Sequence, residues 1–181
     1  MQPNPRAETS RDQFQRNRPQ WWIALGCTWA ALSEDKAMRT VSSNSRTLIG
    51  KCLCGAVQVA IADKFCYAGY CHCPDCRASS GSAFSAFAGI RKEKLQLTCG
   101  EENISKFRKN EDNVIHFCRR CGSWLFSIVR NAEFAHVRLG ILIDDPSIRP
   151  TFHIFVGSKA PWETICDGLA QFVGLPEDPP A

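Results

Sequence analysis

The 181-residue chain has the length of one domain plus a tail, and 44% apolar with 22% charged residues is ordinary globular usage. Its net charge of +4 falls mostly in residues 1–46, which hold seven Lys/Arg and four Asp/Glu, so the rest lacks the basic surface of a nucleic-acid-binding protein. Eleven cysteines, an odd number, exclude complete disulfide pairing, and their close C-x-C and C-x-x-C pairs favour metal binding in a reducing, cytoplasmic setting.

Residues 1–46 are predicted to form an extension outside the folded domain. Met1–Gln20 is polar and holds too few apolar residues to offset the cost of ordering the chain, so we expect disorder there. Trp21–Leu32 is an apolar run of twelve residues, shorter than the roughly twenty that a membrane span needs. A signal peptide is a second interpretation of this run, although its long, acid-containing leader and the many thiols argue against export. A native start at Met38 is a further alternative, and Cys27 is interpreted as structural or incidental.

Residues 47–175 are predicted to form the domain, followed by a short tail at 176–181. Alternating apolar and polar residues predict seven short strands separated by turn residues, and no window has the pattern of a long amphipathic helix. The expected strands are Ala56–Ile61, Phe84–Ile90, Leu95–Thr98, Val114–Phe117, Trp124–Val129, Ala135–Leu139 and His153–Val156. Many short strands with few or short helices predict a mainly β sandwich or open barrel.

Two cysteine pairs have the spacing of a structural zinc site. Cys52 and Cys54 form a C-x-C pair, and residues two apart in an extended segment point to the same side. Flanking glycines, Gly50 and Gly55, permit backbone angles that let the chain wrap closely around a metal. The other half is the C-x-x-C-G knuckle of Cys118 and Cys121. Together they predict a zinc with four cysteine ligands that joins the first strand to a late hairpin, with buried free cysteines as the less favoured interpretation.

Cys71, Cys73 and Cys76 place three further thiols within six residues. With the other four clustered thiols assigned to one ion, these three lack an obvious fourth partner, and an open position distinguishes a catalytic zinc from a structural one. The candidates for a fourth ligand are His72, His116, His153, Cys66 and Cys99. The isolated cysteines, Cys166 included, are interpreted as buried small residues, so the open site is favoured.

An open three-thiolate zinc would be a weak Lewis acid, because three thiolates and Zn²⁺ sum to about −1. Such a site suits the binding of another thiol as its thiolate, and the bound sulfur could then attack a small electrophile such as an aldehyde. Arg77, next to Cys76, could balance the excess negative charge or hold a substrate carboxylate; a surface salt bridge is an equal alternative.

Four groups of motifs resemble the glutathione-dependent formaldehyde-activating enzyme family, whose domain is shared with centromere protein V. They are G-x-C-x-C-G at Gly50–Gly55, C-H-C-x-x-C-R-x-x-x-G at Cys71–Gly81, F-C-x-x-C-G at Phe117–Gly122, and a tail from Arg149–Ile154 through Gly157–Trp162 to Asp167–Leu169. The resemblance implies a tent-like, zinc-supported β fold with a structural zinc on Cys52, Cys54, Cys118 and Cys121 and a second zinc on Cys71, Cys73 and Cys76. It also implies a carbon–sulfur lyase activity that joins glutathione and formaldehyde to give S-hydroxymethylglutathione.

Glutathione carries two carboxylates and an ammonium, so its site needs cations and an apolar wall. Arg77, Lys159 and Trp162 are the candidate substrate-binding residues, although Trp162 beside Pro161 is also interpreted as a core anchor. Two alternatives to an enzyme stay open: a non-catalytic protein-binding module of the centromere protein V type, and a thiol redox switch on Cys73 and Cys76. No membrane or nucleic-acid partner is expected, and the sequence leaves the oligomeric state and the true electrophile open.

Overall fold

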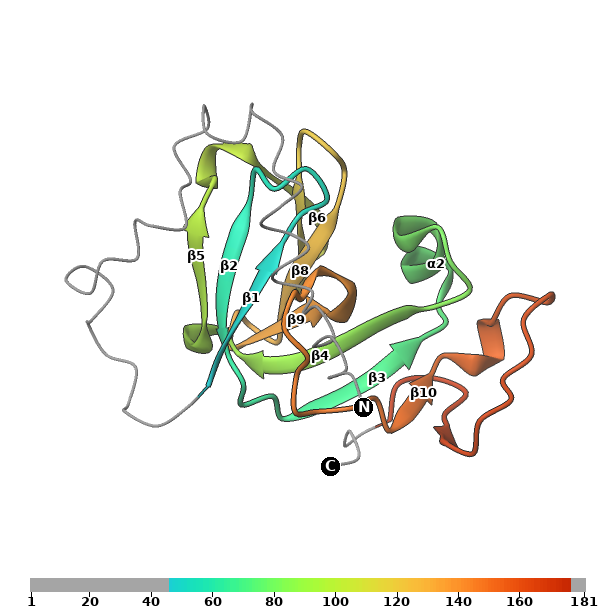
Figure 1. The fold of residues 1–181 in the computed structure, drawn as a ribbon. Coiled ribbons are helices and arrows are strands. Elements are labelled where there is room, and N and C mark those ends of the chain that lie inside the picture. Colours follow the sequence, from blue (N-terminus) through green and yellow to red (C-terminus); the bar gives the residue numbers. More distant parts are fainter. Residues whose placement is uncertain (1–45, 177–181) are drawn as a thin grey trace, which may run out of the picture. The chain divides into compact units, whose positions relative to one another are not determined.

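The computed structural model describes residues 46–176, which contain two β-sheets and one short α-helix (Figure 1). The smaller sheet is antiparallel with the order β1-β2-β5, and its strands are Thr47–Lys51, Gln58–Ala62 and Leu95–Cys99. The larger sheet has the order β11-β10-β3-β4-β9-β8-β7-β6. In chain order its strands are β3 (Tyr67–Cys71), β4 (Ser85–Arg91), β6 (Ile104–Asn110), β7 (Asn113–Cys118), β8 (Trp124–Val129), β9 (Phe134–Arg138), β10 (Phe152–Ile154) and β11 (Ala170–Gln171).

Helical structure in the described residues is short. The α-helix, α2, spans Pro74–Ser80, and the 3-10 helices are η3 (Lys92–Lys94), η4 (Glu101–Asn103), η5 (Leu139–Ile141) and η6 (Val156–Ser158). The prediction of a mainly β fold with few or short helices is therefore confirmed. Every predicted strand is present, with ends within two residues of the prediction.

Four strands were not predicted, and each lacks a clear period of two. β3 has the sequence YAGYC, in which small residues replace the expected apolar ones. β6 has the sequence ISKFRKN and lies at the edge of the larger sheet, where it is mostly exposed. An edge strand rich in lysine and arginine is a known protection against strand addition by another molecule. β1 has the sequence TLIGK, in which two adjacent apolar residues obscure the alternation, and β11 has only two residues.

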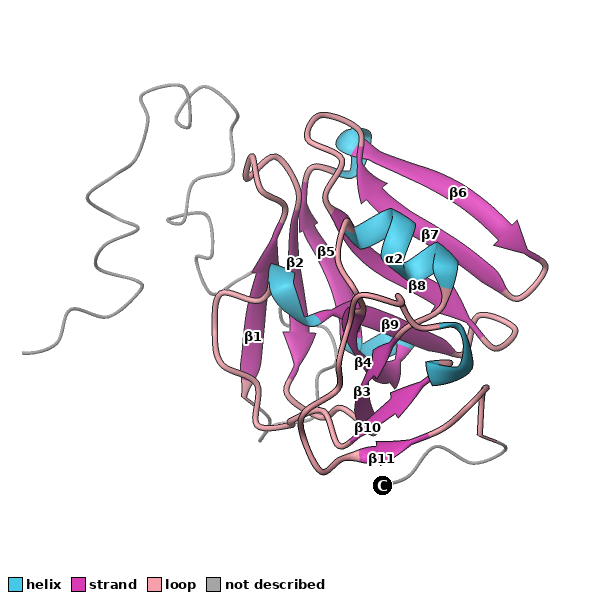
Figure 2. Cartoon of the chain, turned by 90° about the vertical axis from the view of Figure 1, so that its right-hand side faces the viewer, coloured by secondary structure: helices cyan, strands magenta, loops and turns pink. Residues whose placement is uncertain are grey.

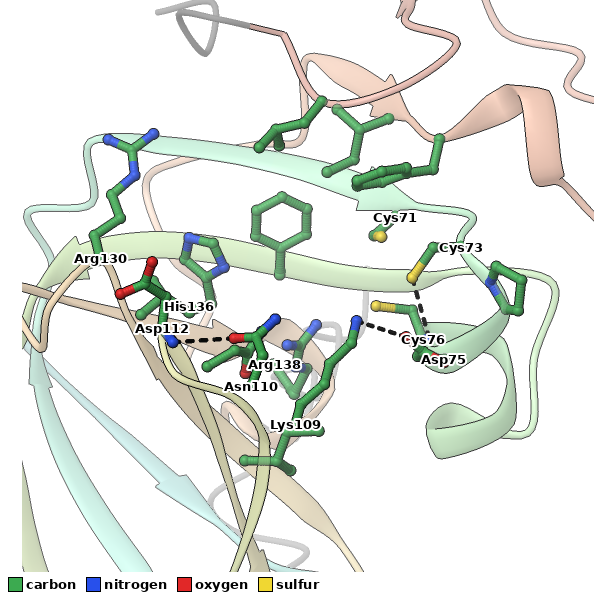
Figure 3. A pocket seen from close by; sticks show the side chains of 18 of the residues that line it. Cys71, Cys73, Asp75, Cys76, Lys109, Asn110, Asp112, Arg130, His136 and Arg138 are labelled. Carbon is green, nitrogen blue, oxygen red and sulfur yellow. Dashed lines mark hydrogen bonds and ion pairs between the residues drawn. The ribbon is translucent and has the colours of Figure 1, made fainter.

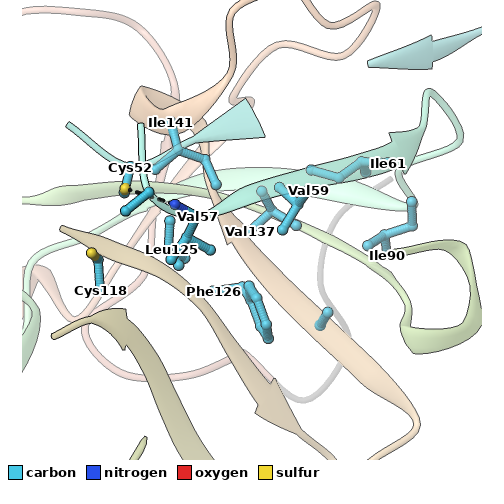
Figure 4. Packing of buried hydrophobic residues seen from close by; sticks show 12 residues of the cluster. Cys52, Val57, Val59, Ile61, Ile90, Cys118, Leu125, Phe126, Val137 and Ile141 are labelled. Atoms are coloured by element: carbon cyan, nitrogen blue, oxygen red, sulfur yellow. Dashed lines mark hydrogen bonds between the residues drawn. The ribbon is translucent and has the colours of Figure 1, made fainter. Parts of the chain in front are cut away.

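The hydrophobic core lies between the two sheets (Figure 4). Val59 and Ile61 alternate along β2 and pack with Ile90 of β4, Leu125 of β8 and Val137 of β9. All five are fully buried. Burial of an aliphatic side chain of this size contributes about 1.5–3 kcal/mol, so this layer is the main source of the fold's stability.

The opposite face of the larger sheet carries the polar chemistry. Side chains alternate along a strand, so on β9 Val137 points into the core while His136 and Arg138 point to the other face. β10 extends this face by pairing in parallel with β3, with Phe152 opposite Gly69. The helix α2 follows β3 after two residues and lies on the same face (Figure 2). There Asp75 forms an ion pair with Lys109, near the end of β6.

Several predictions lie outside the described residues. They are those for the extension up to residue 45, including Trp21–Leu32, Cys27 and Met38, and for most of the tail. Among residues 46–176, no helix has the length and apolar character that a membrane crossing requires.

Candidate metal centres and their cavity

Two groups of cysteines gather in the fold, and they match the two predicted clusters. In the first, the four sulfurs of Cys52, Cys54, Cys118 and Cys121 all lie within 4.8 Å of one another. The Cys52–Cys54 and Cys54–Cys118 sulfur separations are 3.6 and 3.8 Å. A tetrahedral zinc with bonds of about 2.3 Å places its sulfurs about 3.8 Å apart, so this arrangement fits the metal.

Two turns build this first cluster. Cys52 and Cys54 occupy the turn after β1, and Gly55 ends it with a φ of 75°. Gly122 plays the same part in the β7–β8 turn, also with a φ of 75°. The expectation of an extended Cys52–Cys54 segment was therefore wrong, because a turn brings the two sulfurs together. Gly50 needs no unusual φ; it lies in β1, where a Cβ would come within 2.9 Å of Val59 Cγ2.

Hydrogen bonds and burial set the charge that this cluster can carry. The Val57 amide donates to Cys52 Sγ over 3.2 Å, yet burial raises the pKa of Cys52 to about 12. Burial also opposes ionisation of Cys121, but hydrogen bonds, chiefly from Ser123, outweigh it and lower its pKa to about 6. Four clustered thiols cannot all ionise without a compensating cation, and soft sulfur ligands favour zinc among the common ones.

The second cluster spans the β3–α2 junction. Cys71 ends β3, Cys73 caps the N-terminus of α2, and Cys76 lies in its first turn; their sulfurs also lie within 4.8 Å of one another. Pro74, in the first helical turn, fits there because its missing N–H is not needed. The Cys76 amide donates to Cys73 Sγ over 3.4 Å.

Hydrogen bonds among the three thiols of this second cluster shift their pKa values in opposite directions. Hydrogen bonds from Cys71 and Cys76 lower the pKa of Cys73 to about 2, while the bond to Cys73 raises the pKa of Cys71. The three thiols lie close enough to share protons through hydrogen bonds. Such a donor set fits a soft divalent metal, which would replace the shared protons.

A cavity of about 590 Å³ adjoins the second cluster (Figure 3). Its walls are the alternate residues of the larger sheet that face away from the core, including Tyr67, Phe87, His136 and Phe152. This volume lies within the range of small-molecule sites, and mostly apolar walls with a few polar groups are typical of them.

Two glycines allow the aromatic wall to lie flat against the sheet. A Cβ on Gly69 would come within 2.4 Å of the Phe152 ring, and one on Gly89 within 2.2 Å of the Tyr67 ring. Tyr67 Oη is 2.7 Å from His136 Nε2. Burial, with the nearby Arg138 and Arg130 charges, lowers the pKa of His136 to about 3, so this hydrogen-bonded pair is neutral at pH 7.

Two cations beside the cluster were not predicted from the sequence. Arg138 is buried, donates to Ser85 Oγ (3.0 Å) and Ser127 Oγ (3.3 Å), and places its Cζ 3.6 Å from the centroid of the Trp124 ring. Burial lowers its pKa to about 10, although the sulfurs of the second cluster favour its charge, and it stays protonated at pH 7.

Lys109 is the second of these cations, and its Nζ lies 2.6 Å from Asp75 Oδ2. Partial burial opposes its charge, but Asp75 and then Cys73 outweigh that effect and raise its pKa. The alternation of β9 could have drawn attention to Arg138, which lies one residue from Val137. Nothing in the sequence distinguished Lys109 from its neighbours, because β6 is an exposed strand with several other charged residues.

The three residues predicted to bind substrate do not line this cavity. Arg77 donates to the Ser158 carbonyl over 3.3 Å, and Lys159 Nζ donates to the Glu163 carbonyl over 2.6 Å. Trp162 is 70% exposed, which contradicts its interpretation as a core anchor.

The candidate fourth ligands are engaged elsewhere. His72 Nε2 is 2.8 Å from His153 Nδ1, and His153 Nε2 is 3.0 Å from Asp167 Oδ1. His116 stacks on Phe126 with centroids 4.6 Å apart, and its Nδ1 is 3.1 Å from the Val114 carbonyl oxygen.

The other candidate cysteines also lie apart from the second cluster. Cys99 ends β5 in the other sheet, and neither it nor Cys66 belongs to either sulfur cluster. Cys66 and Cys166 are exposed, so their interpretation as buried residues was wrong. Within residues 46–176, therefore, no fourth donor joins Cys71, Cys73 and Cys76.

Comparisons with known proteins agree with these motifs. The sequence model of the family described as glutathione-dependent formaldehyde-activating enzyme matches residues 47–158. An uncharacterized lyase of Schizosaccharomyces pombe is 29% identical over 84 residues, which are 46% of this chain and 59% of that protein. A Rhodobacter sphaeroides protein of known crystal structure matches with 26% identity and a TM-score of 0.45, over 56% of this chain and 91% of its own.

Proposed function

Since the chain belongs to the glutathione-dependent formaldehyde-activating enzyme family, we propose that it binds glutathione at the cavity beside Cys71, Cys73 and Cys76. The enzyme then adds glutathione to formaldehyde, or to a related small electrophile, and forms S-hydroxymethylglutathione. This is carbon–sulfur lyase chemistry, and the S. pombe relative carries the name of a lyase. A reducing, cytoplasmic location suits both the thiols and the substrate.

The observation that carries this proposal is the position of the second cluster. Its three sulfurs lie at the wall of a substrate-sized cavity, and no fourth donor from the described residues joins them. We propose that these three cysteines hold a zinc with one position open toward the cavity, and that the other four cysteines hold a closed, structural zinc. When bound at the open site, zinc would supply a Lewis acid that favours the thiolate form of an incoming thiol.

The chain's own residues would prepare the cavity for this reaction. Arg138 and Lys109 place two positive charges beside a cluster that is negative overall, which reduces the repulsion that an incoming thiolate meets. The aromatic wall of Phe87 and Phe152 limits the water that can reach the electrophile. In the reaction the glutathione sulfur bonds to the formaldehyde carbon, the carbon–oxygen double bond becomes single, and the thiol proton ends on that oxygen. No other reactant is consumed.

Metal analysis combined with cobalt substitution tests the proposal. We expect two metal equivalents per chain, and we expect glutathione to change the cobalt–thiolate absorption of one of them. Cys76→Ser should lose one equivalent together with this response and the catalysed formation of S-hydroxymethylglutathione, measured by NMR above the spontaneous rate. Cys66→Ser is the matched control, because Cys66 is an exposed thiol outside both clusters and should behave as wild type.

Absence of any glutathione response in the fully metal-loaded protein would contradict the proposal. A cobalt spectrum typical of four protein ligands at both sites would point instead to a non-catalytic scaffold that binds another protein.

A further inference from the structure

The end of the cavity away from the cysteines carries a pair of opposite charges that none of the steps above uses. Antiparallel pairing of β7 and β8 places Asn113 opposite Val129. Asp112 directly precedes β7 and Arg130 directly follows β8, so the register brings them to neighbouring positions at this end of the cavity. Both line the cavity, and Figure 3 shows them at the opposite end from Cys73 and Cys76.

Within residues 46–176, these two side chains differ from the other charged groups of the cavity in having no hydrogen-bond or ion-pair partner. Lys109 is paired with Asp75, and Arg138 is held by two serine hydroxyls. In the part of the chain that the structure describes, the Arg130 guanidinium forms no hydrogen bond or ion pair, and neither does the Asp112 carboxylate. Arg130 Cζ instead lies 6.0 Å from the Tyr67 ring centroid and 5.5 Å from that of Phe134.

The turn that carries Arg130 is fixed in position. Arg130, Asn131 and Ala132 have φ values of 53°, 50° and 65°, an arrangement that side chains normally avoid. The Glu133 amide closes the turn by donating to the Arg130 carbonyl over 2.9 Å, and the Lys92 amide donates to the Glu133 carbonyl over 2.9 Å. The guanidinium is therefore attached to a defined backbone, next to an aromatic surface that favours a cation.

We propose that Arg130 and Asp112 bind the free α-amino acid end of the thiol substrate, with the carboxylate on Arg130 and the ammonium on Asp112. An arginine fork matches a carboxylate in two parallel hydrogen bonds, and an unpaired carboxylate complements an ammonium. The cavity then selects a thiol that carries a zwitterionic α-amino acid group at a distance from its sulfur, as the γ-glutamyl end of glutathione does. Thiols without that group fill only the cysteine end. The inference rests on the proposed function, because it takes the sulfur to lie at the cysteines.

Calorimetric titration of the purified full chain tests this recognition separately from the metal. The first probe is γ-glutamyl-2-aminobutyryl-glycine, a glutathione analogue with a methyl group in place of the thiol. The second is the same peptide with butyryl in place of γ-glutamyl, which lacks both the ammonium and the carboxylate of that α-carbon. We expect Arg130→Gln and Asp112→Asn each to weaken the first probe about tenfold, the loss of one charge-assisted contact. Neither substitution should weaken the second probe, whose wild-type affinity should already be lower.

Matched substitutions lie on β6 and in the β6–β7 turn that also carries Asp112. Arg108→Gln and Glu111→Gln each remove one exposed charge outside the cavity, and both should leave the affinity of the first probe within about twofold of wild type. Equal weakening by these controls would show a general charge effect and overturn the inference. Equal affinity of wild type for the two probes would overturn it as well.

The two proposals can fail separately. If glutathione changes the cobalt spectrum but Arg130→Gln and Asp112→Asn bind the first probe as wild type does, the proposed function stands and this inference fails. If both variants weaken the first probe but glutathione never affects the metal, the amino-acid site stands and the proposed thiol chemistry fails.

Discussion

Gly89→Ala is the substitution whose consequence the structure defines most closely. Gly89 on β4 lies opposite Tyr67 on β3, and an alanine Cβ would come within 2.2 Å of Tyr67 Cζ and 2.7 Å of Tyr67 Oη. Contacts between carbon atoms normally begin at about 3.5 Å, so the ring must shift by about 1 Å or more. That shift breaks the 2.7 Å hydrogen bond between Tyr67 Oη and His136 Nε2.

The expected cost follows from three contributions. Overpacking costs about 1–3 kcal/mol, and loss of the hydrogen bond costs about 1 kcal/mol. The reduced freedom of the unfolded chain returns about 0.4–1 kcal/mol. The net loss is therefore about 2–3 kcal/mol of unfolding free energy, or roughly 5–10 °C in Tm for a domain of this size.

Urea unfolding of a double-mutant cycle with Tyr67→Leu measures this effect. In the Tyr67→Leu background the ring is gone, so Gly89→Ala should cost at least about 1 kcal/mol less than it does alone. Gly140→Ala is the control: a Cβ there meets no atom within 4 Å, and its backbone φ is not positive, so stability should be unchanged or slightly higher. The same loss from Gly89→Ala in both backgrounds would show that the Tyr67 ring is not the cause.

Three further outcomes are expected. Arg138→Met should lower the unfolding free energy by about 3 kcal/mol, read from the urea midpoint at constant slope, because two serine hydroxyls and the cysteine cluster lose a buried charged partner; an unchanged midpoint would contradict this. The ¹³Cε1 resonance of His136, assigned with His136→Gln, should stay flat from about pH 8 to 5, and a midpoint near 6.5 would refute its burial. In the unfolded chain His136 takes up a proton near pH 6.5, whereas in the folded protein it does so only near its lowered pKa of about 3. The free energy of unfolding therefore decreases as the pH falls from about 6.5 to about 3, by at most about 1.4 kcal/mol per pH unit. Cys118→Ser should lose one metal equivalent and lower Tm strongly, whereas Cys76→Ser should lose one equivalent with a smaller change in Tm, both followed by metal analysis and calorimetry.

Strand periodicity predicted most of the fold because a strand with one buried face alternates apolar and polar residues along its sequence. β2 and β9 alternate clearly, and each contributes residues to the layer between the sheets. β6 was missed because it is a mostly exposed edge strand. Its charged residues stand where a buried face would require apolar ones. The cysteine clusters were found from spacing alone, since ligands close in sequence need little tertiary information to converge.

The cavity could not be predicted in the same way. Its charged residues come from α2, from β6, from β9 and from two hairpin turns, and their meeting depends on strand order and register. Arg138 looked like any polar residue in an alternating strand, and Arg130 like any turn residue. Arg77, Lys159 and Trp162 were chosen because they lie near motifs in sequence, and none of them lines the cavity.

The surroundings of the two cysteine clusters separate their proposed roles better than the number of sulfurs does. Cys52 and Cys118 are fully buried within the layer between the sheets, where their turns join β1 of one sheet to β7 and β8 of the other. A metal there would tie the sheets together and meet no substrate. Cys71 and Cys73 are nearly as buried, but they lie on the far face of the larger sheet, beside the cavity and two cations. The chemical difference that supports the proposed roles is the cavity beside the second cluster, which gives it room for another sulfur.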